Sequence, residues 1–199
     1  MNILVTGGDG RLAKKLKSKN SDVFITPSKT ELDLLNPNSI KDIVSMYPNM
    51  DGIILNATIK YNELDSLTTD DWFDVGVNNR LIEIFRLNVL ASSQLTYSYQ
   101  HSLKFVIGLT TGCIEPKSHI DCCESYILGK DMLSSHLYRL SNKFKNTTII
   151  TINPGPMRNE GDFDYNANTL IKLIENINEC ESGKSYEISE FYTTSKSLM

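Results

Sequence analysis

The sequence has 199 residues, of which 40% are hydrophobic and 22% are charged, and its net charge is -4. The length fits one domain over residues 1–199, and the composition argues against a disordered, collagenous or coiled-coil chain. The acidic balance argues against a nucleic-acid partner, and no apolar run approaches the roughly 18–20 residues that cross a membrane.

Short runs rich in Ile, Val and Leu alternate with longer segments of helical period. This pattern predicts an α/β fold, a single Rossmann-type doubly wound parallel sheet of about seven strands with helices on both faces. The strands are expected at Asn2–Thr6, Val23–Thr26, Leu32–Leu34, Gly52–Asn56, Lys104–Leu109, Thr147–Ile152 and Ser185–Ile188. The helices are expected at Leu12–Ser18, Pro37–Met46 with Asn36 as its N-cap, Thr68–Ser102 as one helix or two, Asp121–Phe144 and Asn168–Glu179.

The first residues, MNILVTGG, lack the basic segment and small-residue cleavage site of a secretory signal, so a cytoplasmic protein is expected. The four cysteines are Cys113, Cys122, Cys123 and Cys180. Adjacent Cys122 and Cys123 could indicate a redox or metal site. However, no C-x-x-C pair or His stands at ligand spacing, so we interpret all four as reduced thiols and expect no metal site.

A glycine-rich turn, TGGDGRLA, follows the first expected strand and leads into a helix, which is the context of a dinucleotide-binding loop. Its glycines let backbone N–H groups approach a pyrophosphate, and the helix N-terminus adds partial positive charge. We therefore assign Gly7, Gly10, Arg11 and Leu12 to a cofactor site. A plain tight turn is the alternative for such a segment taken alone.

The end of the second expected strand reads Thr26-Pro27-Ser28-Lys29, with no carboxylate until Glu31. A basic side chain at this place accommodates the 2′-phosphate of NADP, whereas an acidic one favours NAD. Ser28 and Lys29 therefore predict a preference for NADP(H), with NAD(H) possible. A solvated surface lysine is the alternative interpretation of Lys29.

Seven segments in this order resemble the short-chain dehydrogenase/reductase family over nearly the whole chain. They are TGGDGRLA, LDLL at Leu32–Leu35, NAT at Asn56–Thr58, NVLA at Asn88–Ala91, TTG at Thr110–Gly112, YILGK at Tyr126–Lys130 and NPGPMRN at Asn153–Asn159. The glycine turn is similar to that of the dehydrorhamnose reductases, whereas the ending SGKSYEIS is similar to that of the shorter ketoreductases.

The resemblance implies further cofactor contacts, position by position. Asp33 and Leu34 would contact the adenine, Asn56 and Ala57 would lie beneath the adenosine ribose, and Pro154, Gly155 and Met157 would flank the nicotinamide. Tyr126 and Lys130 would also contact the cofactor.

The resemblance also implies hydride transfer, with Tyr126 as general acid/base and Lys130 as its partner. Lys130 lies four residues after Tyr126, one helical turn along the same face, so its charge can favour the phenolate and reach the nicotinamide ribose.

The hydroxyl that binds the substrate oxygen is usually a serine in this family, and we expect Thr111, with Thr110 close behind, to take its place here. Leu109 at the serine's position is the alternative, and it would argue against activity. An asparagine that shapes a proton-relay water matches Asn88 best, with Asn79 as the alternative.

The resemblance thus predicts an oxidoreductase that moves a hydride between NADP(H) and a carbonyl or alcohol of a small metabolite or nucleotide sugar. It has a minimal substrate region at about 156–168, and it pairs into a homodimer or homotetramer through the helices that hold Asn88 and Tyr126. A dinucleotide-binding sensor without chemistry is the first alternative. A nucleotide-sugar epimerase or dehydratase is the second, although it needs a larger C-terminal region.

Overall fold

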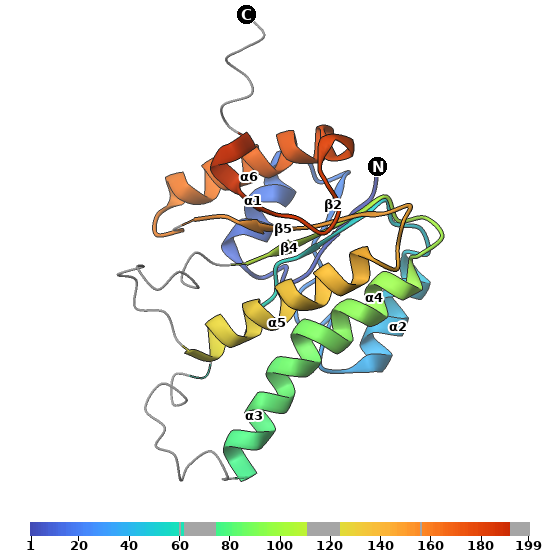
Figure 1. Cartoon of the computed structure of the whole chain (residues 1–199), viewed down its shortest axis with the longest axis vertical. Coiled ribbons are helices and arrows are strands. Elements are labelled where there is room, and N and C mark those ends of the chain that lie inside the picture. The colour runs from blue at the N-terminus through green and yellow to red at the C-terminus, as the bar shows by residue number, and fades with distance from the viewer. Residues whose placement is uncertain (60, 62–74, 111–123, 156, 192–199) are drawn as a thin grey trace, which may run out of the picture.

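The structure, a computed structural model, describes residues 1–59, 61, 75–110, 124–155 and 157–191. Its described strands are all parallel and form one six-stranded sheet in the order β2-β1-β3-β4-β5-β6 (Figure 1). Their bounds are β1 Ile3–Val5, β2 Phe24–Ile25, β3 Gly52–Leu55, β4 Phe105–Leu109, β5 Thr148–Asn153 and β6 Ser185–Glu187. The strand order reverses direction at β1, so the carboxyl ends of β1 and β3 border the crevice where such sheets bind ligands.

The six strands match six of the seven expected runs, but the prediction of a strand at Leu32–Leu34 was wrong. The chain there forms successive turns, in which the Leu32 N–H donates to Ser28 O at 2.9 Å and the Asn36 N–H donates to Asp33 O at 3.0 Å. The Leu32 side chain is buried in the core, although its backbone forms a turn. A short apolar run can therefore contribute to the core without forming a strand.

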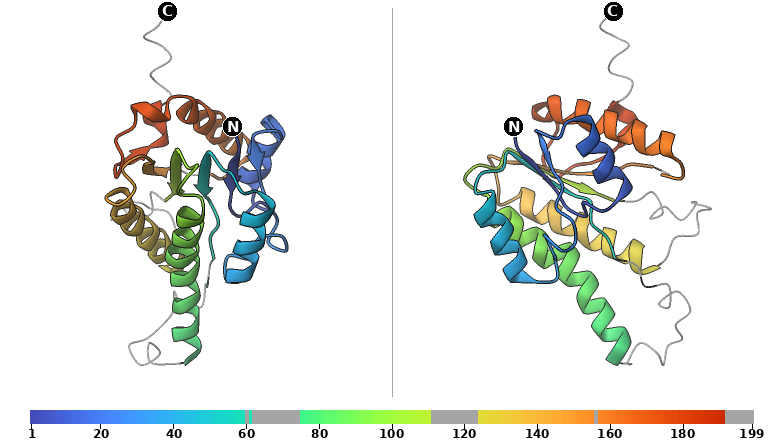
Figure 2. Two further views of the ribbon diagram at one scale, coloured as in Figure 1. Left: turned by 90° about the vertical axis from the view of Figure 1, so that its right-hand side faces the viewer. Right: turned by 180° about the vertical axis from the view of Figure 1, so that it is seen from behind.

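Helices cover both faces of the sheet, as a doubly wound fold requires. They are α1 Arg11–Lys19, α2 Pro37–Met46, α3 Val75–Phe85, α4 Ser92–Ser98, α5 Glu124–Ser141 and α6 Glu160–Glu175. α1 and α6 lie on one face, and α2, α4 and α5 lie on the other (Figures 1 and 2). Asn36 caps α2 as expected, because its side chain accepts from the Asn38 N–H at 3.0 Å. No helix in these ranges is both long and apolar enough to cross a membrane.

α3 and α4 form one continuous rod, joined by the π-helical segment Arg86–Ala91. The extra residue of a π turn shifts the helix face that follows it, and such turns are frequent at functional sites. Of the two predicted arrangements for this segment, the described part therefore matches one long helix.

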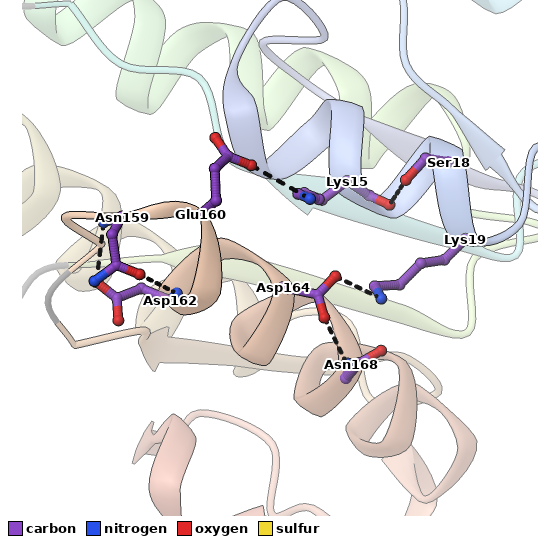
Figure 3. Close-up of polar contacts among 8 residues, drawn as sticks. All are labelled: Lys15, Ser18, Lys19, Asn159, Glu160, Asp162, Asp164 and Asn168. Carbon is purple, nitrogen blue, oxygen red and sulfur yellow. Dashed lines mark hydrogen bonds and ion pairs between the residues drawn. The ribbon is translucent and has the colours of Figure 1, made fainter.

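α6 begins eight residues before the predicted start at Asn168, so this boundary was wrong. Asn159 accepts from the Asp162 N–H at 3.1 Å, and Asp162 accepts from the Asn159 N–H at 3.2 Å, which is a capping box. Ion pairs from α1 then hold α6 at Glu160, 3.3 Å from Lys15, and at Asp164, 2.9 Å from Lys19 (Figure 3). The expected substrate region at 156–168 is therefore largely helix.

Candidate active site

A cavity of about 430 Å³ lies at the carboxyl ends of β1 and β3. It brings together most of the cofactor residues predicted from sequence: Gly7, Gly10, Arg11, Leu12, Lys29, Asp33, Leu34, Asn56, Ala57 and Met157 all line it. A separate hollow of about 490 Å³ between α5 and β5–β6 contains no predicted site residue. The first cavity is therefore the candidate site, and its volume suits a small organic ligand.

The glycine-rich turn builds one wall of this cavity. Gly7 has a φ of 71°, and a Cβ there would lie 3.0 Å from Ala57 Cα, so the turn needs glycine for both conformation and close approach. Gly10 is the N-cap of α1, and neither a capping side chain nor an acidic residue occupies its first turn. The N–H groups at this helix end can therefore bind an anion.

The wall is fixed by a hydroxyl that sequence reasoning did not single out. Thr6 Oγ1 accepts from the N–H groups of Asn56 and Ala57, each at 3.0 Å, and Asn56 Nδ2 donates back to Thr6 O at 3.1 Å. The loops after β1 and β3 are thus joined. The Asn56 side chain serves this joint and lines the cavity at the same time.

The expected adenosine end is bordered by carboxylates. Glu31 accepts from both the N–H and the hydroxyl of Ser28, each at 2.8 Å, and these bonds lower the pKa of the Glu31 carboxyl. The Lys29 N–H donates to Asp9 at 2.8 Å, and the exposed Lys29 side chain lies at the cavity. Asp33 accepts from the Leu35 N–H at 3.0 Å.

The expected nicotinamide end follows β5. Gly155 has a φ of 67°, and its N–H donates to Asn153 Oδ1 at 3.0 Å. Pro154 is buried, and Met157 packs on the core beneath the cavity. Met157 lines the same cavity as Gly7 and Gly10 of the glycine-rich turn.

Tyr126 and Lys130 lie on the first turns of α5. Lys130 is only 2% exposed, and its Nζ lies 3.4 Å from Ala57 O and 5.9 Å from the centre of the Tyr126 ring. Burial lowers the pKa of the Lys130 ammonium to about 8. The lysine therefore connects α5 to a cavity-lining residue and lies beside the phenol.

Asn88 and Asn79 differ sharply in their surroundings. Asn88 is buried in the π-helical segment, where its Nδ2 donates to Ile84 O at 2.9 Å, whereas Asn79 is exposed. A Cβ on Gly129 would lie 2.8 Å from Asn88 Nδ2, so the glycine lets α5 lie close to this side chain in its present position. Asn88 is thus the asparagine next to the Tyr126–Lys130 helix.

Of the two threonines expected to bind the substrate oxygen, Thr110 is described. It is buried directly after β4, and its N–H donates to Ile152 O at 2.8 Å. Thr111 and three of the cysteines, Cys113, Cys122 and Cys123, lie outside the described residues. Cys180 is partly buried and free.

Comparisons with known proteins agree with this architecture. No protein-family model matches the sequence, and no curated protein matches it. Among solved structures, an oxidoreductase of the short-chain dehydrogenase/reductase family from Brucella ovis, with a partially ordered NAD, has a TM-score of 0.70 at 16% identity, covering 94% of this chain and 98% of that one.

Two further solved structures contain NADPH. BdcA in complex with NADPH has a TM-score of 0.68 at 12% identity, covering 94% of this chain and 91% of that one. NADPH-bound carbonyl reductase from chicken fatty liver has a TM-score of 0.64 at 15% identity, covering 94% and 84%. The fold of this chain is therefore that of the short-chain dehydrogenase/reductase family.

Proposed function

We propose that the protein is a nicotinamide-dinucleotide-dependent oxidoreductase that acts on a carbonyl or alcohol of a small metabolite or nucleotide sugar. The observation that carries this proposal is that Lys130 Nζ, which lies 5.9 Å from the ring centre of the candidate acid/base Tyr126, contacts the carbonyl of Ala57, a residue that lines the candidate cofactor cavity. Solved structures of the same fold bind NADPH or NAD. We further propose that the chain is one dinucleotide-binding domain.

The residues present fit such a cofactor. The uncapped N-terminus of α1 would offer N–H groups to the pyrophosphate, and Asp33, Leu34 and Met157, which line the cavity, would border the adenine and the nicotinamide as the resemblance implies. When bound, the cofactor supplies the hydride. Side chains of the protein supply the proton transfer and the hydrogen bond to the substrate oxygen.

Tyr126 transfers the proton to or from the substrate oxygen. A phenol with a pKa of about 10 transfers protons poorly at neutral pH, and a neighbouring ammonium favours its ionised form. Lys130, 5.9 Å from the ring centre, is in place to do this. Thr110 or Thr111 then donates a hydrogen bond to the substrate oxygen, and Asn88 shapes the proton path beside Gly129.

Two features, the burial of Lys130 and the early start of α6, argue against the two alternative functions. An ammonium in the protein interior is costly, and a dinucleotide sensor has no need of it. An epimerase or dehydratase needs a larger substrate region, whereas α6 begins five residues after Gly155. Both features favour the oxidoreductase.

The first prediction concerns Tyr126. Tyr126→Phe removes one oxygen and keeps the ring, so folding and dinucleotide binding should persist while carbonyl reduction falls about 10²–10⁴-fold. Steady-state rates on a carbonyl that the wild type reduces would measure this loss, with Tyr138→Phe, an exposed tyrosine of the same helix, as the control. Full activity of Tyr126→Phe would show that the mechanism is wrong.

The second prediction concerns the charge on Lys130. Because its pKa is about 8 in the folded protein and 10.5 ordinarily, the unfolded chain binds more protons between these pH values, so wild-type stability should rise across that window. Lys130→Met should therefore gain stability relative to wild type at pH 7, on the order of 3 kcal/mol, and lose most of that gain by about pH 10.

Urea denaturation at both pH values would measure the effect, with exposed Lys143→Met as the control. Lys130→Met should also lose turnover and dinucleotide affinity. A stability gain that is equal at pH 7 and pH 10 would contradict the charged, buried lysine.

The third prediction concerns cofactor choice. We propose a preference for NADP(H), with the exposed Lys29 side chain at the 2′-phosphate and Ser28 able to donate once Glu31 moves away. Lys29→Glu should then weaken NADPH binding and leave NADH binding nearly unchanged. Glu31→Gln should strengthen NADPH binding, because it removes a carboxylate from the Ser28 donors. Fluorescence titration would measure the NADPH and NADH affinities of the wild type and of both variants, and a wild type that binds NADH as tightly as NADPH would overturn the preference.

The fourth prediction concerns assembly. We propose a homodimer that pairs through α4, α5 and the π-helical segment, where Leu90, Tyr97 and Tyr138 are 50%, 43% and 61% exposed. Leu95, also expected at this face, is fully buried in the core instead. Light scattering at micromolar concentration should give the mass of two chains, and Tyr138→Glu should reduce it to one. A monomeric wild type would refute the pairing.

A further inference from the structure

Two contacts fasten α5 to the loop after β3. Lys130 Nζ lies 3.4 Å from Ala57 O, and Ser125 Oγ lies 2.9 Å from Tyr61 N and 3.4 Å from Tyr61 O. The loop and the helix run in opposite directions here, because Ala57 contacts Lys130 whereas the later loop residue Tyr61 contacts the earlier helix residue Ser125. Tyr126 lies between the two fastened positions of α5, so the loop runs past the helix turn that carries it.

The Ser125 hydroxyl makes a tertiary contact. The side chain is only 2% exposed, and its oxygen both accepts from the Tyr61 N–H and donates to the Tyr61 carbonyl. A serine at the start of a helix more often bonds to its own helix backbone. Here the same group reaches a residue 64 positions earlier in the chain.

Tyr61 is itself held from the opposite side by α3. Its hydroxyl donates to Glu83, and the guanidinium of Arg80 lies 5.6 Å from the ring centre. The ring also packs against the buried Val77 and Ile84. Ser125 therefore ties the first turn of α5 to a point that α3 already fixes.

We infer that Ser125 is a positioning residue for the proposed reaction, because it sets the place of the Tyr126 phenol relative to the cavity. Proton transfer requires heavy atoms within roughly 2.6–3.2 Å, and a misplacement of about 1 Å lowers rates on the order of 100-fold. This inference rests on the proposed function.

The test compares Ser125→Ala with Ser141→Ala. Ser141 is also a buried serine of α5, but its hydroxyl donates to Tyr138 O within the helix. Ser125→Ala should lower kcat about 10-fold or more. Its dinucleotide affinity should stay within about twofold of wild type, because the Lys130 contact remains. Ser141→Ala should keep wild-type kcat.

Two measurements separate positioning from a merely structural role. Hydrogen exchange of the Tyr61 amide should speed up in Ser125→Ala and not in Ser141→Ala, whatever the activity. Ser125→Thr, which keeps the hydroxyl, should restore kcat. If Ser125→Ala does not fold, Ser125→Cys takes its place, since it keeps the volume and weakens the hydrogen bonds.

The outcomes distinguish the two proposals. If Ser125→Ala keeps wild-type kcat per dinucleotide-binding site while Tyr126→Phe is inactive, the positioning inference fails and the proposed function stands. The same holds if Ser125→Thr is as slow as Ser125→Ala. If the wild type reduces no carbonyl, or Tyr126→Phe is fully active, the proposed function fails and the inference falls with it.

Discussion

The burial of one ammonium group, on Lys130, constrains the whole site. Within the part of the chain that the structure describes, no carboxylate pairs with it, and burial alone lowers its pKa. Such a group is unfavourable in the core unless nearby oxygens meet it. Its oxygen partner, the Ala57 carbonyl, must therefore be held in place, and the bonds between Thr6 and the β3 loop hold it. The joint between two strand ends thus supports a residue on a helix.

The sequence predicted the sheet well, and it placed the glycine-rich turn correctly between a strand and a helix, because both follow from local patterns. A strand buried on both faces needs a short, continuous apolar run, and a phosphate loop needs glycines between a strand and a helix. Prediction from local patterns failed where the same sequence pattern is compatible with two kinds of secondary structure. Leu32 is buried from a turn rather than a strand, and Asn159 with Asp162 starts α6 in a segment that resembled a loop. Backbone hydrogen bonds of successive turns decided the outcome at Leu32, and the side-chain bonds of a capping box decided it at α6.

The residues that fix the site were harder to predict than those that form it. Tyr126 and Lys130 are one helical turn apart, so their pairing is visible in the sequence. Thr6 and Asn56 are 50 positions apart, and Ser125 and Tyr61 are 64 apart. Serine and threonine carry no periodic signal, and only the folded arrangement selects which hydroxyl finds a distant backbone group. The start of α6, by contrast, has a local signal, because Asn159 and Asp162 have the spacing of a capping box, with aspartate in place of the usual glutamate.

α6 makes one side of the cavity a wall rather than a movable lid. Its ion pairs with Lys15 and Lys19 are partly exposed, and such pairs contribute little. Its main anchor is apolar, because Phe163, Ala167 and Leu170 are buried in the core beneath α1. The guanidinium of Arg11 lies 4.3 Å from the centre of the Phe163 ring, so this wall also holds a cationic group that lines the candidate cavity. An element packed this firmly presents a fixed surface, and a binding group that is held in place in this way loses less conformational freedom when a ligand binds.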